Sequence, residues 1–233
     1  MGVVRTALAR VEDWFLEPVE PPAGVGPGPA TGPRPVIAVF SLGREAGATV
    51  VARALAAELA GRDPEGAAVV GCSLPRGGIP LASPAAGRLA RALIDLHGAR
   101  TRVAGRLCLV DVPGPVPLVE ASRQLAPLVL DGGGAEIGGA CAAVADRSVL
   151  VASADAEPSL AAVAAGCLAR VGAAPVLAVN RIRPGREWRG AGAIELPESR
   201  MGAQLALGGR EPRGDLGRAV ARLADACAGP PLG

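Results

Sequence analysis

Short apolar runs alternate with alanine-rich stretches from Pro35 almost to the end of the chain, and this alternation constrains the fold more than any other feature. The apolar runs are continuous, which is typical of strands that are covered on both faces. Strands that alternate with helices along a chain form a parallel sheet with helices on both sides. The sequence therefore predicts a three-layer α/β/α domain on a mostly parallel, doubly wound sheet of about seven strands.

The expected strands and helices occupy separate, short segments. We expect strands near 35–41, 67–73, 106–111, 127–131, 147–153, 174–180 and 192–196. We expect helices near 47–61, 84–97, 117–125, 134–145, 157–171 and 214–228. Because the chain has 233 residues and half of them are hydrophobic, it is long enough for one domain with a full core.

The first 34 residues follow a different pattern from the rest of the chain. Residues 2–17 have a helical period, and their apolar face consists of Val3, Val4, Ala7, Leu8, Val11, Trp14 and Phe15. Residues 18–34 are rich in proline and glycine, a composition that forms a tether rather than a core. We therefore divide the chain into an amphipathic N-terminal helix (1–17), a flexible linker (18–34) and the α/β domain (35–233).

The predicted N-terminal helix is a candidate contact surface. Trp14 and Phe15 are half of the four aromatic residues in the chain. A tethered amphipathic helix can fold back on its own domain, bind a partner protein, pair with a second copy or lie on a membrane. Glu12 and Asp13 on the polar face disfavour a lipid surface. A protein partner is therefore the preferred alternative to folding back, and we expect membrane contact to be absent or indirect.

Composition excludes several classes of function. The net charge of +2 is spread along the chain, so nucleic-acid binding has no electrostatic support. One histidine and five scattered cysteines without a C-x-x-C pair argue against a zinc site. No window contains the ~18 apolar residues of a membrane span, and the start lacks a signal-peptide core. We expect a cytoplasmic protein with reduced, buried cysteines.

The loop after the first predicted strand resembles a phosphate-binding loop, in which backbone N–H groups and a helix N-terminus bind the anion. The pattern G-x(4)-G-K-[ST] is matched by Gly47 and Thr49. Leu42 stands at the opening glycine and Ala48 at the lysine. Taken alone, this loop fits an ordinary strand-to-helix turn at least as well.

Three later features strengthen the nucleotide interpretation because of their order. Asp131 ends an apolar strand before a run of glycines, Asn180 ends another, and Pro197 follows a third. Together with the loop, they resemble the MinD/ParA family of P-loop ATPases over residues 35–228, closest to its CpaE/TadZ branch. The resemblance implies ATP or ADP with Mg²⁺, a possible homodimer, and a bacterial cytoplasmic role in positioning or assembling a pilus or secretion machine.

The resemblance also implies roles for particular residues. Thr49 and Asp131 correspond to the magnesium ligands, while Asp111, at the end of an earlier strand, is the reserve for Asp131. Asn180 and Pro197 correspond to the groups that contact the adenine base. The implied nucleotide-binding residues are Gly43, Arg44, Glu45, Ala46, Gly47, Ala48, Thr49, Val50, Asn180, Arg181 and Pro197.

The departures from the family pattern affect the charged groups. Gly43 stands at the signature lysine, Ala48 at the loop lysine, and no carboxylate follows the second strand near Gly71. Hydrogen bonds to charged groups contribute about 1.5–3 kcal/mol each, so nucleotide affinity falls by orders of magnitude when two are lost. Two hypotheses remain: a degenerate, non-hydrolysing scaffold with no catalytic residue, and a working Mg-ATP dimerisation switch.

Overall fold

A computed structural model describes residues 34–71, 89, 92–93, 100–112, 116–132, 135–171, 175–190 and 192–228. The predicted N-terminal helix, the linker as far as residue 33 and the end of the predicted strand 67–73 lie outside the described residues. Of the predicted helix 84–97, only residues 89, 92 and 93 are described, and all three are helical.

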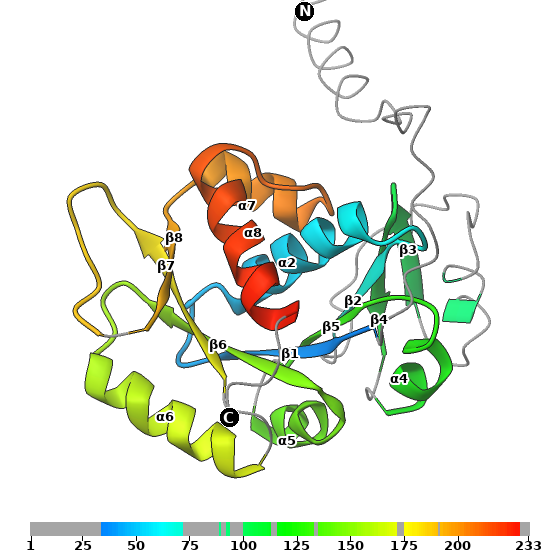
Figure 1. The fold of residues 1–233 in the computed structure, drawn as a ribbon, viewed down its shortest axis with the longest axis horizontal. Helices are drawn as coiled ribbons and strands as arrows, with labels where there is room; N and C mark the ends of the chain where they lie inside the picture. Colours follow the sequence, from blue (N-terminus) through cyan, green and yellow to red (C-terminus); the bar gives the residue numbers. More distant parts are fainter. Residues whose placement is uncertain are drawn as a thin grey trace, which may run out of the picture.

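The described residues form one eight-stranded sheet (Figure 1). Its strand order is β3-β4-β2-β5-β1-β6-β7-β8. All neighbouring strands pair in parallel except β3 and β4, which are antiparallel. The strands are β1 (Val36–Ser41), β2 (Ala67–Gly71), β3 (Arg100–Ala104), β4 (Leu107–Asp111), β5 (Leu128–Asp131), β6 (Arg147–Ser153), β7 (Val176–Ile182) and β8 (Ile194–Pro197).

Helices cover both faces of this sheet, so the predicted three-layer α/β/α architecture is confirmed (Figure 1). One core cluster contains buried residues of α2 (Ala48–Arg62), α7 (Arg200–Leu207) and α8 (Gly214–Ala228). The opposite cluster contains residues of α4 (Val116–Ser122) and α5 (Ala135–Val144), with α6 (Pro158–Val171) packed against it. Within the described part of the chain, no helix is long and apolar enough to cross a membrane.

Two elements were not predicted from the sequence. The sheet has eight strands instead of about seven because β3 forms a hairpin with β4 at the edge of the sheet. Its sequence begins Arg-Thr-Arg, so it lacks the apolar run by which the other strands were found. The short helix α7 is also additional, and the Ser199 hydroxyl caps it by accepting from the Gly202 amide at 3.0 Å.

The cysteines were expected to be buried, and this is wrong for one of them. Cys108, Cys141 and Cys227 are buried, whereas Cys167 on α6 is exposed. Burial raises the pKa of the Cys108 thiol to about 11 and that of the Cys227 thiol to about 12. Because the thiolate is the reactive form, these two groups are protected from alkylation at neutral pH.

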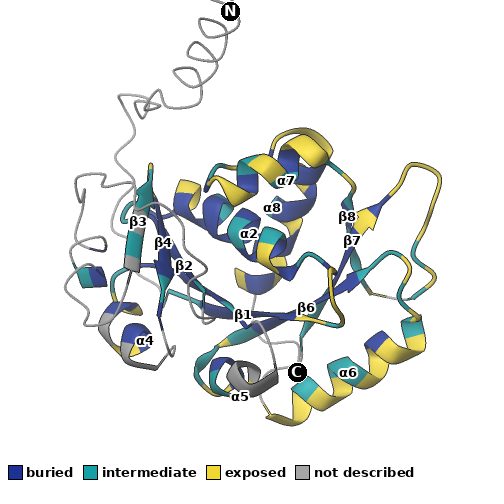
Figure 2. Cartoon of the chain, turned by 180° about the vertical axis from the view of Figure 1, so that it is seen from behind, coloured by how far each residue is buried: buried dark blue, intermediate teal, exposed yellow. Residues whose placement is uncertain are grey.

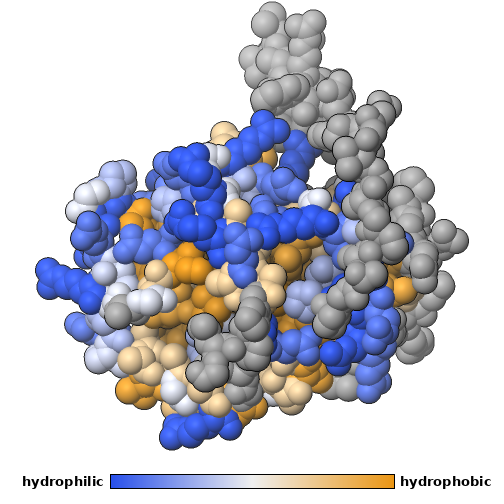
Figure 3. Space-filling view, viewed as in Figure 1, coloured by the Kyte–Doolittle hydropathy of each residue, from blue (hydrophilic) through white to orange (hydrophobic). Residues whose placement is uncertain are grey.

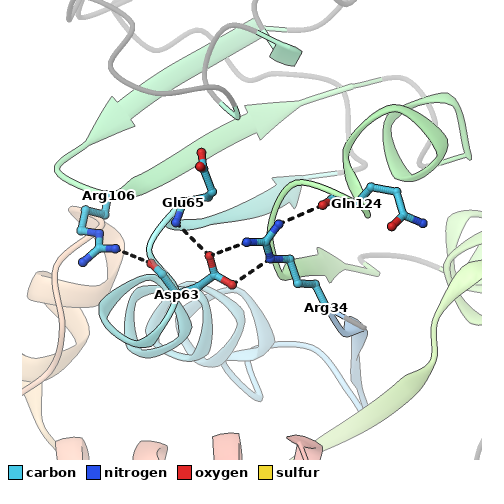
Figure 4. A network of polar contacts seen from close by, with 5 residues as sticks. All are labelled: Arg34, Asp63, Glu65, Arg106 and Gln124. Carbon is cyan, nitrogen blue, oxygen red and sulfur yellow. Dashed lines mark hydrogen bonds and ion pairs between the residues drawn. The ribbon is translucent and has the colours of Figure 1, made fainter. Parts of the chain in front are cut away.

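A partly buried ion pair fixes the start of the domain (Figure 4). Arg34 Nε donates to Asp63 Oδ2 at 2.9 Å, and Arg34 Nη1 donates to the Gln124 carbonyl at 2.8 Å. The Glu65 amide donates to Asp63 Oδ1 at 2.9 Å, and Arg106 donates to the Asp63 carbonyl oxygen. This network joins the chain just before β1 to the end of α2 and to the turns before β4 and β5.

Replacing the buried carboxylate should destabilise the domain measurably. We expect Asp63→Asn to lower the free energy of unfolding by about 1.5–3 kcal/mol, because the partly buried Arg34 guanidinium loses its counter-charge. Urea unfolding followed by circular dichroism measures the change. The control is Asp225→Asn, which removes an exposed partner of Arg62 and should cost less than about 1 kcal/mol. Equal losses for the two variants would contradict this account.

Candidate functional site

The loop between β1 and α2 turns sharply through two residues in the left-handed region. Glu45 has φ 62° and Gly47 has φ 86°. A non-glycine residue in this conformation is uncommon and requires support from its surroundings. The loop is held at its start, where the Leu42 amide donates to the Val151 carbonyl at 2.9 Å and the Ser41 hydroxyl donates to the Gly43 carbonyl at 2.5 Å.

Many amide groups of this loop are available to a ligand. The amides without a hydrogen-bond partner among the described residues are those of Gly43, Arg44, Glu45, Gly47, Ala48, Thr49 and Val50. The last three belong to the first turn of α2, where every helix leaves its amides unpaired. The others precede the helix, so the loop as a whole offers more donors than a helix end alone. Such a set of amides, with the helix dipole, binds anions.

The side chains of the loop supply little charge to that site. Ala48, the first residue of α2, is buried in the core, and Leu42 packs against the core on the α5 side. Arg44 and Glu45 are both exposed, so one cation and one anion stand next to each other at the surface. A phosphate bound here would therefore rely mainly on backbone amides.

The structure separates the two candidate magnesium aspartates. Asp131 ends β5, the strand that pairs directly with β1, and its register partner is Val39. Asp111 ends β4, with Gly71 of β2 between the two aspartates. Because neighbouring strands lie about 4.8 Å apart, Asp111 is ~10 Å farther from β1 than Asp131. Thr49 is exposed in the first turn of α2, at the same edge of the sheet as Asp131.

A pocket of about 270 Å³ lies beside the loop and brings together several predicted residues. Gly47, Val50, Asn180, Arg181 and Pro197 all line it, although they come from three separate parts of the chain. Its remaining walls are residues of α2, β8, α7 and α8 and the turn after β8. Sites for drug-sized ligands are roughly 300–1,000 Å³, so this pocket suits one part of a nucleotide, such as the base.

Asn180 connects the pocket to the loop. Its side chain is buried, with Nδ2 donating to the Ala46 carbonyl at 2.9 Å and Oδ1 accepting from the Arg181 amide at 3.0 Å. A carboxamide has two N–H groups and two oxygen lone pairs, so half of its hydrogen-bonding capacity remains for a ligand. Arg181 is exposed and has φ 64°, a second non-glycine residue in the left-handed region.

Sequence reasoning missed the apolar floor of the pocket. Ala54 of α2 and Val220 of α8 form part of it, and Ala203 of α7 forms part of one wall. The sequence does contain a signal for α7 that was overlooked. A capping serine, Ser199, precedes an apolar helical period. Without α7, the residues that follow Pro197 had no assigned place at the site.

Comparisons with solved structures identify the fold. No protein-family model and no curated protein matches the sequence. Among solved structures, a ParA family ATPase from Chlorobium tepidum has a TM-score of 0.59 at 13% identity, covering 82% of this chain and 98% of its own. The fold is that of the MinD and ParA ATPases.

Two MinD structures agree with this result. MinD from Pyrococcus horikoshii in complex with Mg-ADP has a TM-score of 0.58 at 14% identity, covering 84% of this chain and 96% of its own. The MinC:MinD complex from Aquifex aeolicus has a TM-score of 0.58 at 16% identity, covering 86% of this chain and 98% of the matched chain. At these identities the likeness is one of fold.

The contact between Gly47 and Asn180 makes a testable prediction. A Cβ atom at position 47 would lie 2.3 Å from Asn180 Nδ2, and the backbone there is left-handed. We expect Gly47→Ala to lower the free energy of unfolding by about 2–3 kcal/mol, from backbone strain and loss of the Asn180 hydrogen bond. Chemical denaturation measures this change. Gly43→Ala is the matched control, because a Cβ there meets no atom within 4 Å, and an equally large loss in it would contradict the prediction.

Proposed function

We propose that this chain is a MinD/ParA-like protein that does not hydrolyse nucleotide and acts as a scaffold or localisation factor. By analogy with the CpaE/TadZ branch, its setting is the assembly of pilus or secretion machinery in a bacterial cytoplasm. The observation that carries the proposal is the buried alanine at position 48, where a phosphate loop has its lysine. The proposed partners are proteins, consistent with a MinC:MinD complex among the structures that share the fold.

The charge balance of the loop supports the absence of hydrolysis. Phosphoryl transfer depends on cations that neutralise the developing charge and on a group that positions the attacking water. Gly43 and Ala48 stand where the resemblance implies lysines. Arg44, the one cationic side chain of the loop, is exposed and adjacent to Glu45. Losing two charged contacts weakens the free energy of nucleotide binding by about 3–6 kcal/mol, which lowers the affinity more than a hundredfold.

A second candidate function is an ATP-dependent dimerisation switch. It is favoured by the unpaired amides of the loop and by the pocket next to Asn180 and Pro197. In this reading, Thr49 and Asp131 would hold Mg²⁺, the loop amides would bind the phosphates, and the pocket would take the base. The chemistry of these donors fits the group, because hydroxyl and carboxylate oxygens are the ligands that Mg²⁺ prefers.

Calorimetric titration with ATP and ADP, with and without Mg²⁺, separates the two functions. If the chain is a scaffold, we expect no magnesium-dependent heat of binding at about 1 mM nucleotide. A site with a binding free energy weaker than ~4 kcal/mol stays mostly empty at that concentration. ATP turnover should also be absent. The control is Thr49→Ala, which removes the candidate magnesium ligand. Magnesium-dependent heat in the native protein that disappears in Thr49→Ala would reject the scaffold proposal in favour of the switch.

Restoring the loop lysine tests whether the loop amides still form a phosphate site. We expect Ala48→Lys to raise the affinity for ATP about 10- to 100-fold, because one charged hydrogen bond contributes about 1.5–3 kcal/mol. Competition against a fluorescent ATP analogue measures the affinity. Ala48→Gln, which has similar length without charge, should leave the affinity unchanged. If Ala48→Lys has no effect, the amides do not form a phosphate site.

A further inference from the structure

Helix α6 exposes an apolar surface that its own domain leaves uncovered. Leu160, Val163 and Val171 are 55%, 65% and 64% exposed, and Cys167 between them is also exposed. The opposite side of the helix, including Leu168, packs against the core. A helix that is apolar all round is normally buried, because an amphipathic helix presents polar residues to water.

Helix α6 carries little charge for a helix with so many exposed residues. Arg170 is its only charged residue. The packing partners of the helix are α5 and β6, which lie against its inner side. Figure 2 shows the helix as a largely exposed edge of the molecule, and in Figure 3 the surface over it is coloured mostly tan to orange. Contiguous apolar surface of this kind marks a contact site for another segment or protein.

We propose that residues 2–17 of the same chain bind along the outer face of α6. The sequence predicts an amphipathic helix for this segment, with an apolar face that ends in Trp14 and Phe15. An apolar helix face is normally buried against another surface, and this holds for both the predicted helix and the outer face of α6. The lengths also agree, since 16 helical residues span ~24 Å and the 14 residues of α6 span ~21 Å.

The tether between the two surfaces has a suitable length. Arg34 is anchored at the edge of the sheet where β1 begins, and Val171 ends α6 at the same edge, just before β7. Because β7 is two strands from β1, the lateral separation is ~10 Å, and the helix layer adds ~10 Å. A flexible linker of the length of residues 18–33 spans roughly 20–24 Å. Intramolecular contact is therefore favoured by an effective concentration on the order of millimolar.

The tether selects one direction of docking. Because residue 17 joins the linker, it lies toward the Val171 end of α6, and the two helices then run parallel.

Disulfide trapping at low protein concentration tests the proposal. Cys167 serves as one partner, and Cys72→Ser is present throughout to remove the remaining cysteine that is not shown to be buried. With Val11→Cys on the apolar face, oxidation should give a bond between positions 11 and 167 at monomer mass, identified by peptide mass spectrometry. The control is Asp13→Cys on the polar face, which should react about tenfold more slowly, because a disulfide requires Cβ atoms about 4 Å apart.

Other occupants of the face give different products. Disulfide-linked dimers as the main product would show a second copy on α6 and would overturn the proposal. Equal rates for Val11→Cys and Asp13→Cys would overturn it as well, because they would indicate random collision of the tether.

Alkylation of Cys167 by iodoacetamide gives a second, cross-link-free readout in the otherwise native chain. We expect about tenfold faster labelling after Trp14→Ala with Phe15→Ala, as for a docked state that is ~90% populated. Unchanged labelling in the Trp14 and Phe15 variant, as expected if the segment binds lipid or another protein, would contradict docking on α6.

Discussion

The parallel pairing of β1 with β5 and β6 is the constraint on which the rest of the structure depends. Val36 to Phe40 are buried on both faces, so β1 lies at the centre of the sheet between the two helical layers. Its chain must leave at the carboxyl edge, where the ends of β5, β7 and β8 also lie. In open α/β sheets this edge is where ligands bind. The loop, Asp131 and Asn180 are therefore brought together by the strand order itself.

Much of the fold could be predicted because its strands are apolar enough to be recognised individually. The loop and the pocket residues Asn180 and Pro197 could be placed because parallel strands end at one edge. Strand β3 could not be found, since its stability comes from pairing with β4 and not from its own apolar residues. The exposure of Cys167 was also unpredictable, because an apolar helix sequence indicates burial and does not reveal which partner is missing.

Local backbone conformation was the other feature beyond sequence reasoning. Glu45 and Arg181 adopt the left-handed conformation, and each is next to a residue of the Asn180 contact: Glu45 precedes Ala46, whose carbonyl accepts from Asn180, and Arg181 follows Asn180. Neither residue type favours it, so the conformation is imposed by tertiary contacts. The hydrogen bonds that hold the loop come from Ser41, Leu42 and Asn180, and none of them uses the side chain at position 48.

The anchoring of Arg34 has a mechanical consequence. Any pull on the N-terminal segment reaches Arg34 before it reaches β1, and Arg34 is bonded to the end of α2 and to the turn before β5. Tension is thus divided between two elements instead of peeling the central strand from its neighbours. A chain whose first residues are held by something else could bear load through this junction while the sheet behind it stayed intact.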